Sequence, residues 1–262
     1  MNNVLSFYQN IIFRSWTVRR PDYILLAVHG IGAHSERWRY LGEYLKNTSV
    51  YALELRGCGD NPLPAPVYSF AGLRKDITEM CNYIRQRHPK KKIILIGESM
   101  GGLIAFDYAS QNIDGLVCLS PAFKSLLKFR WYEYLLFPLL FIFPRLKLRI
   151  HFSAKMCTED KKVQDQLKSD RRETRRIPGG LLLAILFAQL RCRRKAGKLK
   201  VPVLFQLAGK DEMVSTAASK QIYKKIPSRK KLIVYKNSRH ALSIEKNRNI
   251  IFRDIQKWVE GL

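Results

Sequence analysis

The sequence KIILIGESMGGLIAFDYA, residues 92–109, joins an apolar run to a second apolar stretch through a glycine-rich turn. The run Ile93–Ile96 predicts a buried strand, and Leu103–Gln111 predicts a helix. Between them, Gly97-Glu98-Ser99-Met100-Gly101 matches the G-x-S-x-G pattern in a strand-to-helix context. A serine in this strained turn is lifted above the sheet edge, so the residues two positions away must be small. The helix N-terminus also favours an oxyanion. We therefore predict that Ser99 is a nucleophile.

A serine hydroxyl is a weak nucleophile, and it needs a base that is oriented by a carboxylate. In this architecture the order along the chain is serine, acid, histidine. Asp211 follows the apolar run Val203–Leu207, and His240 follows the run Lys231–Tyr235. Because catalytic groups of open α/β sheets gather at the carboxyl ends of strands, we predict His240 as base and Asp211 as acid. Glu212 is the competing acid, less favoured because it lies closer to the next helix.

The oxyanion hole is the fourth part of such a site. The apolar run Tyr23–Val28 leads into His29-Gly30-Ile31-Gly32, where glycines let backbone N–H groups face a cleft. We predict that the hole combines the N–H of Met100 with that of Ile31, and that His29 only braces the loop. Loss of one such donor costs about 10²–10³-fold in rate, so this loop should be rigid.

Short apolar runs alternate with amphipathic stretches along most of the chain, which is typical of βαβ units. The remaining predicted strands are Val50–Leu55 and Gly115–Leu119. The other predicted helices are Arg37–Leu45, Leu73–His88, Thr216–Ile226 and Asn249–Val259. Right-handed crossovers through these helices give an α/β fold with a mostly parallel, doubly wound sheet.

The alternation stops in residues 122–200, which we predict to be a helical cap inserted into a core formed by residues 1–121 and 201–262. No strand is evident there, and the apolar stretches Tyr134–Phe143 and Ile177–Leu190 are shorter than the ~20 residues of a membrane-spanning helix. From Lys124 to Lys200 the chain has 20 Lys and Arg against 6 Asp and Glu, a net charge of +14.

The whole chain of 262 residues is 47% hydrophobic and carries a formal net charge of +26. It can bury one substantial core. The charge favours an anionic partner, either a membrane surface or nucleic acid, although a general bias toward Lys and Arg would give the same composition. The N-terminus has no signal-peptide pattern, and the five scattered cysteines form no C-x-x-C pair. We expect reduced thiols and a cytoplasmic protein.

With these residues placed, the chain resembles the monoglyceride lipase and lysophospholipase group of α/β hydrolases, the serine aminopeptidase S33 family. The matching segments are VHGIGAHSERW (28–38), LELRGCGDN (53–61), LIGESMGG (95–102), AGKDEMVSTAASKQIY (208–223) and NSRHAL (237–242). The resemblance implies an α/β-hydrolase fold, Ser99, Asp211 and His240 as the triad, and Ile31 and Met100 as the oxyanion hole. It implies no cofactor and no metal, and hydrolysis of long-chain acyl esters under a helical cap.

The second motif departs from the family, which usually has D-x-R-G-H-G-x-S. Glu54 takes the acidic place, Cys58 the histidine, and Asp60-Asn61 follow. The cap matches none that we can place. The substrate therefore stays open between monoacyl lipid esters and thioesters, peptides or small esters, which the same triad serves.

The segment FRWYEYLLFPLLFIFP, residues 129–144, is apolar and flanked by basic residues. It could pack the cap onto the sheet, line an acyl pocket or contact lipid. Aromatic and aliphatic residues bordered by cations are typical of interfacial segments, so we expect peripheral contact with anionic membrane. A catalytically inactive basic scaffold that binds membrane or nucleic acid is the alternative. The sequence contains no recognised nucleic-acid-binding module, so we do not expect a nucleic-acid partner.

Overall fold

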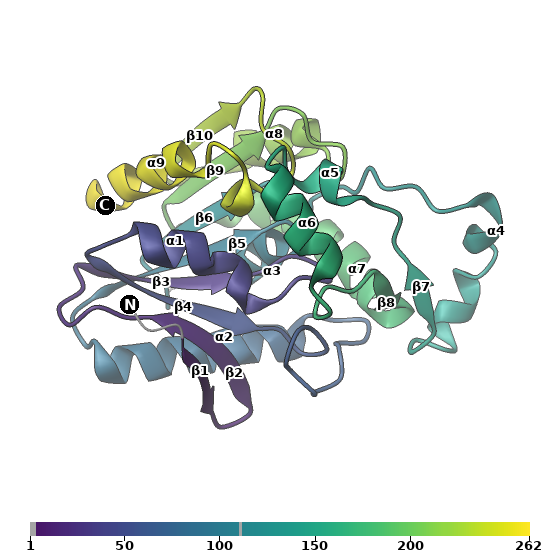
Figure 1. The fold of residues 1–262 in the computed structure, drawn as a ribbon, viewed down its shortest axis with the longest axis horizontal. Coiled ribbons are helices and arrows are strands. Elements are labelled where there is room, and N and C mark those ends of the chain that lie inside the picture. Colours follow the sequence, from purple (N-terminus) through teal and green to yellow (C-terminus); the bar gives the residue numbers. More distant parts are fainter. Residues whose placement is uncertain (1–3, 110–111) are drawn as a thin grey trace.

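The computed structural model of the protein describes residues 4–109 and 112–262. Its centre is an eight-stranded sheet with the order β1-β2-β4-β3-β5-β6-β9-β10 (Figure 1). All strands from β4 to β10 in this order are parallel, whereas β2 is antiparallel to β4 and the edge strand β1 is antiparallel to β2. The strands are β1 (Val4–Tyr8), β2 (Ile11–Trp16), β3 (Tyr23–Val28), β4 (Thr48–Glu54), β5 (Lys92–Glu98), β6 (Gly115–Leu119), β9 (Val203–Ala208) and β10 (Lys230–Tyr235). The predicted mostly parallel, doubly wound sheet is therefore present.

Two hydrophobic cores cover the two faces of this sheet. Successive side chains of a strand point to opposite faces, and on β3 Leu26 enters one core while Leu25 and Ala27 enter the other. One face packs against α2 (Ala71–Arg87), α3 (Met100–Tyr108) and α8 (Thr216–Lys225). The opposite face packs against the 3-10 helix η1 (Ser35–Trp38), α1 (Arg39–Tyr44) and α9 (Arg248–Glu260). The central strands β3, β4 and β9 are thus buried along their whole length.

The predicted strands all occur, within two residues of their predicted ends. The predicted helix Leu103–Gln111 begins earlier, at Met100, and ends at Tyr108, while Ser110 and Gln111 lie outside the described residues. The hairpin β1–β2 was not predicted. Its outer strand leaves the large side chain of Phe7 69% exposed, so the sequence lacks the clear alternation that marks a half-buried strand.

Residues 122–200, which we call the insertion, contain the helices α4 (Trp131–Tyr134), α5 (Ala154–Cys157), α6 (Lys161–Ser169) and α7 (Gly179–Lys195), with 3-10 turns at Pro138–Phe141 (η2) and Ala196–Lys198 (η3). The expectation that it holds no strand is wrong. Strands β7 (Lys147–Arg149) and β8 (Arg176–Pro178) form an antiparallel pair. Three residues per strand are too few to give a visible period of two, and the partners are far apart in sequence.

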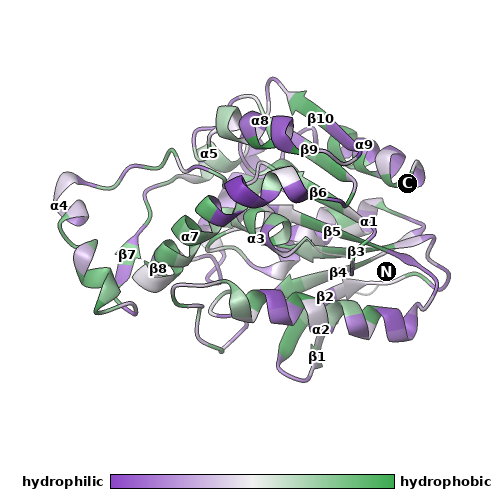
Figure 2. Cartoon of the chain, turned by 180° about the vertical axis from the view of Figure 1, so that it is seen from behind, coloured by the Kyte–Doolittle hydropathy of each residue, from purple (hydrophilic) through white to green (hydrophobic). Residues whose placement is uncertain are grey.

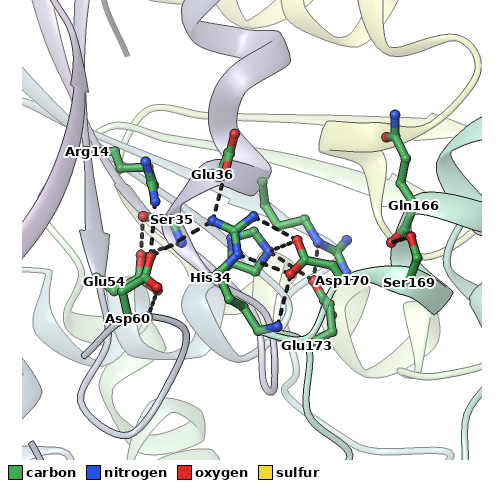
Figure 3. A network of polar contacts seen from close by, with 12 residues as sticks. Arg14, His34, Ser35, Glu36, Glu54, Asp60, Gln166, Ser169, Asp170 and Glu173 are labelled. Carbon is green, nitrogen blue, oxygen red and sulfur yellow. Dashed lines mark hydrogen bonds and ion pairs between the residues drawn. The ribbon is translucent and has the colours of Figure 1, made fainter. Parts of the chain in front are cut away.

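Two polar clusters attach the insertion to the rest of the chain. On one side, the buried Asp107 of α3 accepts hydrogen bonds from Arg74 at 2.6 Å and from Arg191 of α7 at 2.8 Å. On the other side, His34 contacts Asp170 at 3.0 Å and Arg37 donates to Glu173 at 2.8 Å (Figure 3). These contacts fix the insertion over the carboxyl edge of the sheet.

The hydropathy of the helices follows their position. Helix α2 alternates between hydrophobic and hydrophilic residues, as expected for a helix with one buried face, whereas α7 is hydrophobic over its first turns (Figure 2). No helix in the described part of the chain is both long and apolar enough to cross a membrane.

Candidate active site

Ser99 occupies a strained turn between β5 and α3. Its backbone has φ 58° and ψ −119°, outside the regions that non-glycine residues normally adopt. The flanking glycines allow this turn: a Cβ on Gly97 would lie 2.2 Å from the carbonyl oxygen of Gly101, and one on Gly101 would lie 2.1 Å from that of Val28. The residues two positions before and after the serine must therefore be glycines, as predicted, because any side chain there would collide with the backbone.

The structure brings His240 and Asp211 together. His240 Nδ1 lies 2.8 Å from Asp211 Oδ2, while Asp211 Oδ1 accepts backbone N–H groups of Met213 and Val214 at 2.9 Å. These bonds hold the carboxylate in one orientation. The competing acid, Glu212, pairs with Arg239 instead. Asp211 is thus the acid that contacts the histidine.

The electrostatic surroundings of His240 favour its protonation. Burial lowers the pKa of His240, but the charge and hydrogen bond of Asp211 act in the opposite direction, and the net pKa is raised above 6.5. A second carboxylate, Glu98, adds to this effect. The imidazole therefore gains a stronger affinity for a proton than a histidine in water has.

His240 and Ser99 meet at one small cavity. The cavity has a volume of about 40 Å³, and both residues line it. Nε2 is buried and has no hydrogen-bond partner among the described residues. With Nδ1 directed to Asp211, this second nitrogen is available to accept a proton from a group in the cavity. Catalytic hydrogen bonds are often long without substrate and shorten when it binds.

Ile31, in the loop after β3, lines this small cavity, and Met100 directly follows Ser99. Met100 is the first residue of α3, so its N–H has no partner within the helix. Gly30 allows the two loops to approach: a Cβ there would lie 3.2 Å from Ser99 Cβ. Ile31 and Met100, whose N–H groups are predicted to form the oxyanion hole, therefore lie on neighbouring segments that line one cavity with Ser99.

His29 fixes the loop that carries Ile31. The N–H of Leu55 donates to His29 Nε2 at 3.1 Å, so Nδ1 carries the proton and donates to the carbonyl oxygen of Gly30 at 2.8 Å. Burial lowers the pKa of His29 to about 4. A neutral imidazole that uses both nitrogens within the protein is a brace for the loop, as the sequence predicts.

A larger apolar cavity of about 290 Å³ begins at Ser99, Ile31 and Met100 and extends under the insertion. Its walls include Leu127, Phe129, Phe137, Ile150, Leu182 and Ile185. One of its few polar side chains, Gln189, donates to the backbone oxygen of Ala122 at 2.8 Å. The cavity is close to the lower end of the range for ligand sites, about 300–1,000 Å³, and suits an apolar chain.

Sequence reasoning missed Glu245, which positions the loop of His240. This buried carboxylate accepts the backbone N–H of Arg239 at 2.7 Å, the N–H of Glu159 at 2.9 Å and the hydroxyl of Thr158 at 3.1 Å. It therefore joins the histidine loop to the start of α6. No motif marks Glu245 in the sequence, because its role depends on segments that are distant along the chain.

Both carboxylate oxygens of Asp211 and both ring nitrogens of His29 have hydrogen-bond partners within the protein. Among residues 4–109 and 112–262, no group of three or more His, Cys, Asp or Glu side chains is arranged to hold a metal ion. The five cysteines are free and buried. The site thus contains Ser99 and His240, which line one small cavity, and the buried carboxylate of Asp211, which contacts the histidine.

Comparisons with known proteins find similar sequences over most of the chain. The family model described as "Serine aminopeptidase, S33" matches residues 19–247. A human monoglyceride lipase is 25% identical over 268 residues, which cover 96% of this chain and 87% of that protein. An uncharacterized abhydrolase domain-containing protein of Dictyostelium discoideum is 23% identical over 270 residues, 99% of this chain but 28% of that protein.

Solved structures resemble the chain over nearly its whole length. The crystal structure of a monoacylglycerol lipase from Paleococcus ferrophilus has a TM-score of 0.82 at 23% identity, covering 95% of this chain and 97% of that chain. A likeness of this size at such an identity establishes a common fold, whereas activity has to be argued from the site.

Proposed function

Because the chain belongs to the serine aminopeptidase S33 family and has the α/β-hydrolase fold, we propose that it is a serine hydrolase that cleaves carboxylic esters of monoacyl lipids. Ser99 is the nucleophile, His240 the general base, and Asp211 the carboxylate that orients it. The N–H groups of Ile31 and Met100 form the oxyanion hole.

The chemistry proceeds through an acyl-enzyme. Ser99 Oγ bonds to the ester carbonyl carbon while its proton passes to His240 Nε2. The resulting oxyanion accepts hydrogen bonds from the N–H groups of Ile31 and Met100. The carbon–oxygen bond then breaks, and the alcohol leaves with the proton from His240. Water, activated by the same histidine, attacks the acyl-enzyme and releases the carboxylic acid and Ser99.

The observation that carries the lipid part of the proposal is the apolar cavity at Ser99. It begins beside both backbone donors, so an acyl chain inside it would place its carbonyl carbon next to the serine. A charged or peptide acyl group would lose hydration there without gaining partners. The proposed cap, residues 122–200, supplies most of the walls, and residues 1–121 and 201–262 form the proposed catalytic core.

The test of the catalytic assignment is labelling with a fluorophosphonate probe. We expect covalent labelling of the wild-type protein and none of Ser99→Ala. Ser169→Ala, an exposed serine on α6, is the matched control and should label normally. Absence of Ser99-dependent labelling would contradict the enzyme assignment and favour an inactive basic scaffold.

A substrate panel tests the ester class. p-Nitrophenyl esters of increasing chain length, an acyl thioester, a peptide amide, a monoacylglycerol and a lysophospholipid would be compared by kcat/KM. We expect the two monoacyl lipids to rank above the thioester and the peptide. A preference for acetyl esters or peptides would contradict the lipid proposal while leaving the triad in place.

We also propose that a cytoplasmic form of the protein contacts anionic membrane through α4 and the following turn. In the segment 131–146, Trp131 is 78% exposed and Ile142 is 69% exposed, and exposed cations border them at Lys128, Arg130 and Arg145. Figure 1 shows this segment at the far side of the molecule from α9. Exposed aromatic and aliphatic side chains between cations suit the interface of an anionic bilayer.

Vesicle co-sedimentation tests this contact. Binding to vesicles that contain phosphatidylglycerol should exceed binding to neutral vesicles and should weaken with salt. The double variant Trp131→Ala/Ile142→Ser should bind less, whereas Ile250→Ser, which removes an exposed apolar side chain on α9, should bind like wild type. Equal retention on neutral vesicles at high salt would refute the proposal.

A further inference from the structure

A second cavity under the insertion, of about 510 Å³, also adjoins the catalytic centre. It shares Arg37, Phe152, Cys157 and Glu173 with the small cavity that holds Ser99 and His240. The small cavity in turn shares Ile31, Ser99 and Met213 with the apolar cavity. The catalytic serine therefore lies at a junction between an apolar space and this second space.

The second cavity is strongly basic. Its lining includes the cations Arg37, Arg149, Lys168, Arg175 and Arg176 and the anions Asp170 and Glu173. Both carboxylates are already engaged: Glu173 with Arg37 at 2.8 Å, and Asp170 with Arg172 at 2.8 Å and with His34 at 3.0 Å (Figure 3). Lys168 pairs with Asp165, which lies outside the lining. The cavity thus keeps an excess of positive charge after its internal pairs are counted.

Three of these cations have no carboxylate within ion-pair distance among the described residues: Arg149, Arg175 and Arg176. Arg149 and Arg176 are direct cross-strand partners in the β7–β8 ribbon. Like charges opposite each other destabilise such a pair, and an anion bound between the two groups would relieve this repulsion.

Arg175 is held beside the junction by an aromatic ring. Its guanidinium carbon lies 5.3 Å from the ring centroid of Phe152, which lines both the basic cavity and the catalytic one. Guanidinium groups bind phosphate oxygens through paired N–H donors, which makes arginine the preferred cation for phosphate recognition. The three arginines together offer many more such donors than one phosphate needs.

Resting on the proposed function, we propose that this basic cavity binds the phosphate of the alcohol part of the substrate. The preferred substrate is then a lysophospholipid, whose acyl chain fills the apolar cavity while its phosphate contacts Arg149, Arg175 and Arg176. After hydrolysis the fatty acid leaves from one side of Ser99, and the glycerophosphate product leaves from the basic side.

Kinetics with two soluble lipids test the proposal. Octanoyl lysophosphatidylglycerol and monooctanoylglycerol carry the same chain and would be used below their micelle concentrations, which removes membrane effects. We expect wild type to prefer the phosphate lipid by kcat/KM. In Arg149→Gln/Arg175→Gln/Arg176→Gln the ratio of the two kcat/KM values should fall about tenfold or more, because charge-assisted hydrogen bonds to phosphate are lost.

The control removes equal charge elsewhere in the insertion. Arg193→Gln/Arg194→Gln/Lys198→Gln changes three exposed cations outside the cavity and should keep the wild-type ratio. If the ratio of the two kcat/KM values fell equally in both triple variants, with unchanged melting temperatures, the preference would come from long-range attraction between the positive protein and the phosphate lipid. That result would overturn the proposal. So would a wild-type ratio near one. Inorganic phosphate provides a further test as a competitor in the hydrolysis of octanoyl lysophosphatidylglycerol. Inhibition by phosphate that disappears only in the cavity variant supports the site.

Calorimetry separates this proposal from the catalytic one. In the Ser99→Ala background, octanoyl lysophosphatidylglycerol should bind, and the cavity variant should lose that binding. If this holds while the wild type fails to label with fluorophosphonate, the phosphate site stands and the hydrolase proposal fails. If labelling is normal but the phosphate lipid does not bind better than monooctanoylglycerol, the phosphate site fails alone.

Discussion

Asp211 Oδ2 lies 2.8 Å from His240 Nδ1, and the two side chains are only 1% and 4% exposed. A hydrogen bond between a carboxylate and an imidazole that are both buried from solvent fixes the orientation and the tautomer of the ring. Nδ1 must carry the proton, which leaves Nε2 as the acceptor on the side of Ser99. The histidine is therefore prepared for its proposed role before any substrate arrives.

Replacement of Asp211 by Asn should change the tautomer of His240 without unfolding the protein. The amide can donate to Nδ1, which would stabilise the tautomer with its proton on Nε2. We expect kcat to fall by about 10⁴-fold. Ester hydrolysis and circular dichroism measure activity and folding together. Glu212→Gln, which changes the neighbouring acid that pairs with Arg239, should lose far less activity.

The pH dependence of the reaction should follow His240. Only the neutral imidazole can accept the proton of Ser99, and Asp211 raises the pKa of His240 above 6.5 against the effect of burial. The acid limb of a kcat/KM profile should therefore have its midpoint above pH 6.5. In Asp211→Asn, whose remaining reactivity can be followed by fluorophosphonate labelling, the limb should move to lower pH. A midpoint below 6.5 in the wild type would contradict this assignment.

The length of the acyl cavity should be adjustable from α7. Leu182 lines the apolar cavity, and a tryptophan there would fill part of it. In Leu182→Trp we expect kcat/KM for long-chain p-nitrophenyl esters to fall at least tenfold relative to the acetyl ester, since each lost methylene contact is worth roughly 0.8 kcal/mol. Leu190→Trp, at an exposed position of the same helix outside the cavity lining, is the control. Equal changes in the two variants would exclude this position as a determinant of chain length.

The stability of the protein should depend on Asp107, which links α3 to α7. Its carboxylate is 3% exposed and contacts Arg74 and Arg191, which are 32% and 41% exposed. Asp107→Ala leaves both guanidinium groups without a partner, although water reaches them. We expect the free energy of unfolding to fall by roughly 1–3 kcal/mol in urea titrations. Asp165→Ala removes an exposed pair and should change it by less than about 1 kcal/mol.

His29 should make the folded state sensitive to acid. Burial lowers the pKa of His29 to about 4, whereas the unfolded chain titrates near 6.5, so between these values the unfolded state binds more protons. The contribution of His29 to the free energy of unfolding therefore rises from pH 4 to pH 6.5 and is fully present above pH 6.5. The contribution is on the order of 3 kcal/mol. In His29→Gln the slope of unfolding free energy against pH in this window should flatten; an unchanged slope would assign it to other groups.

The sequence alone predicts the six parallel strands of the central sheet, because they are continuous apolar runs with helices between them. It also predicts which residues approach one another at the site. Ser99, Asp211 and His240 each follow a strand, and parallel strands share one carboxyl edge, so their meeting follows from topology. The phosphate-binding arginines and Glu245 follow no such rule, because their contacts depend on how the insertion folds over that edge.

The amino-acid sequence is sufficient to locate Ser99, the proposed nucleophile, since the turn at Ser99 requires glycines at fixed positions and leaves a local pattern. The three-dimensional fold is needed to show that Asp211 rather than Glu212 contacts His240, and that Arg149 and Arg176 are cross-strand partners in a ribbon that was not predicted. The physical reason is distance along the chain. Local backbone geometry is encoded by neighbours, whereas the direction of a side chain and the shape of a cavity depend on packing between remote segments.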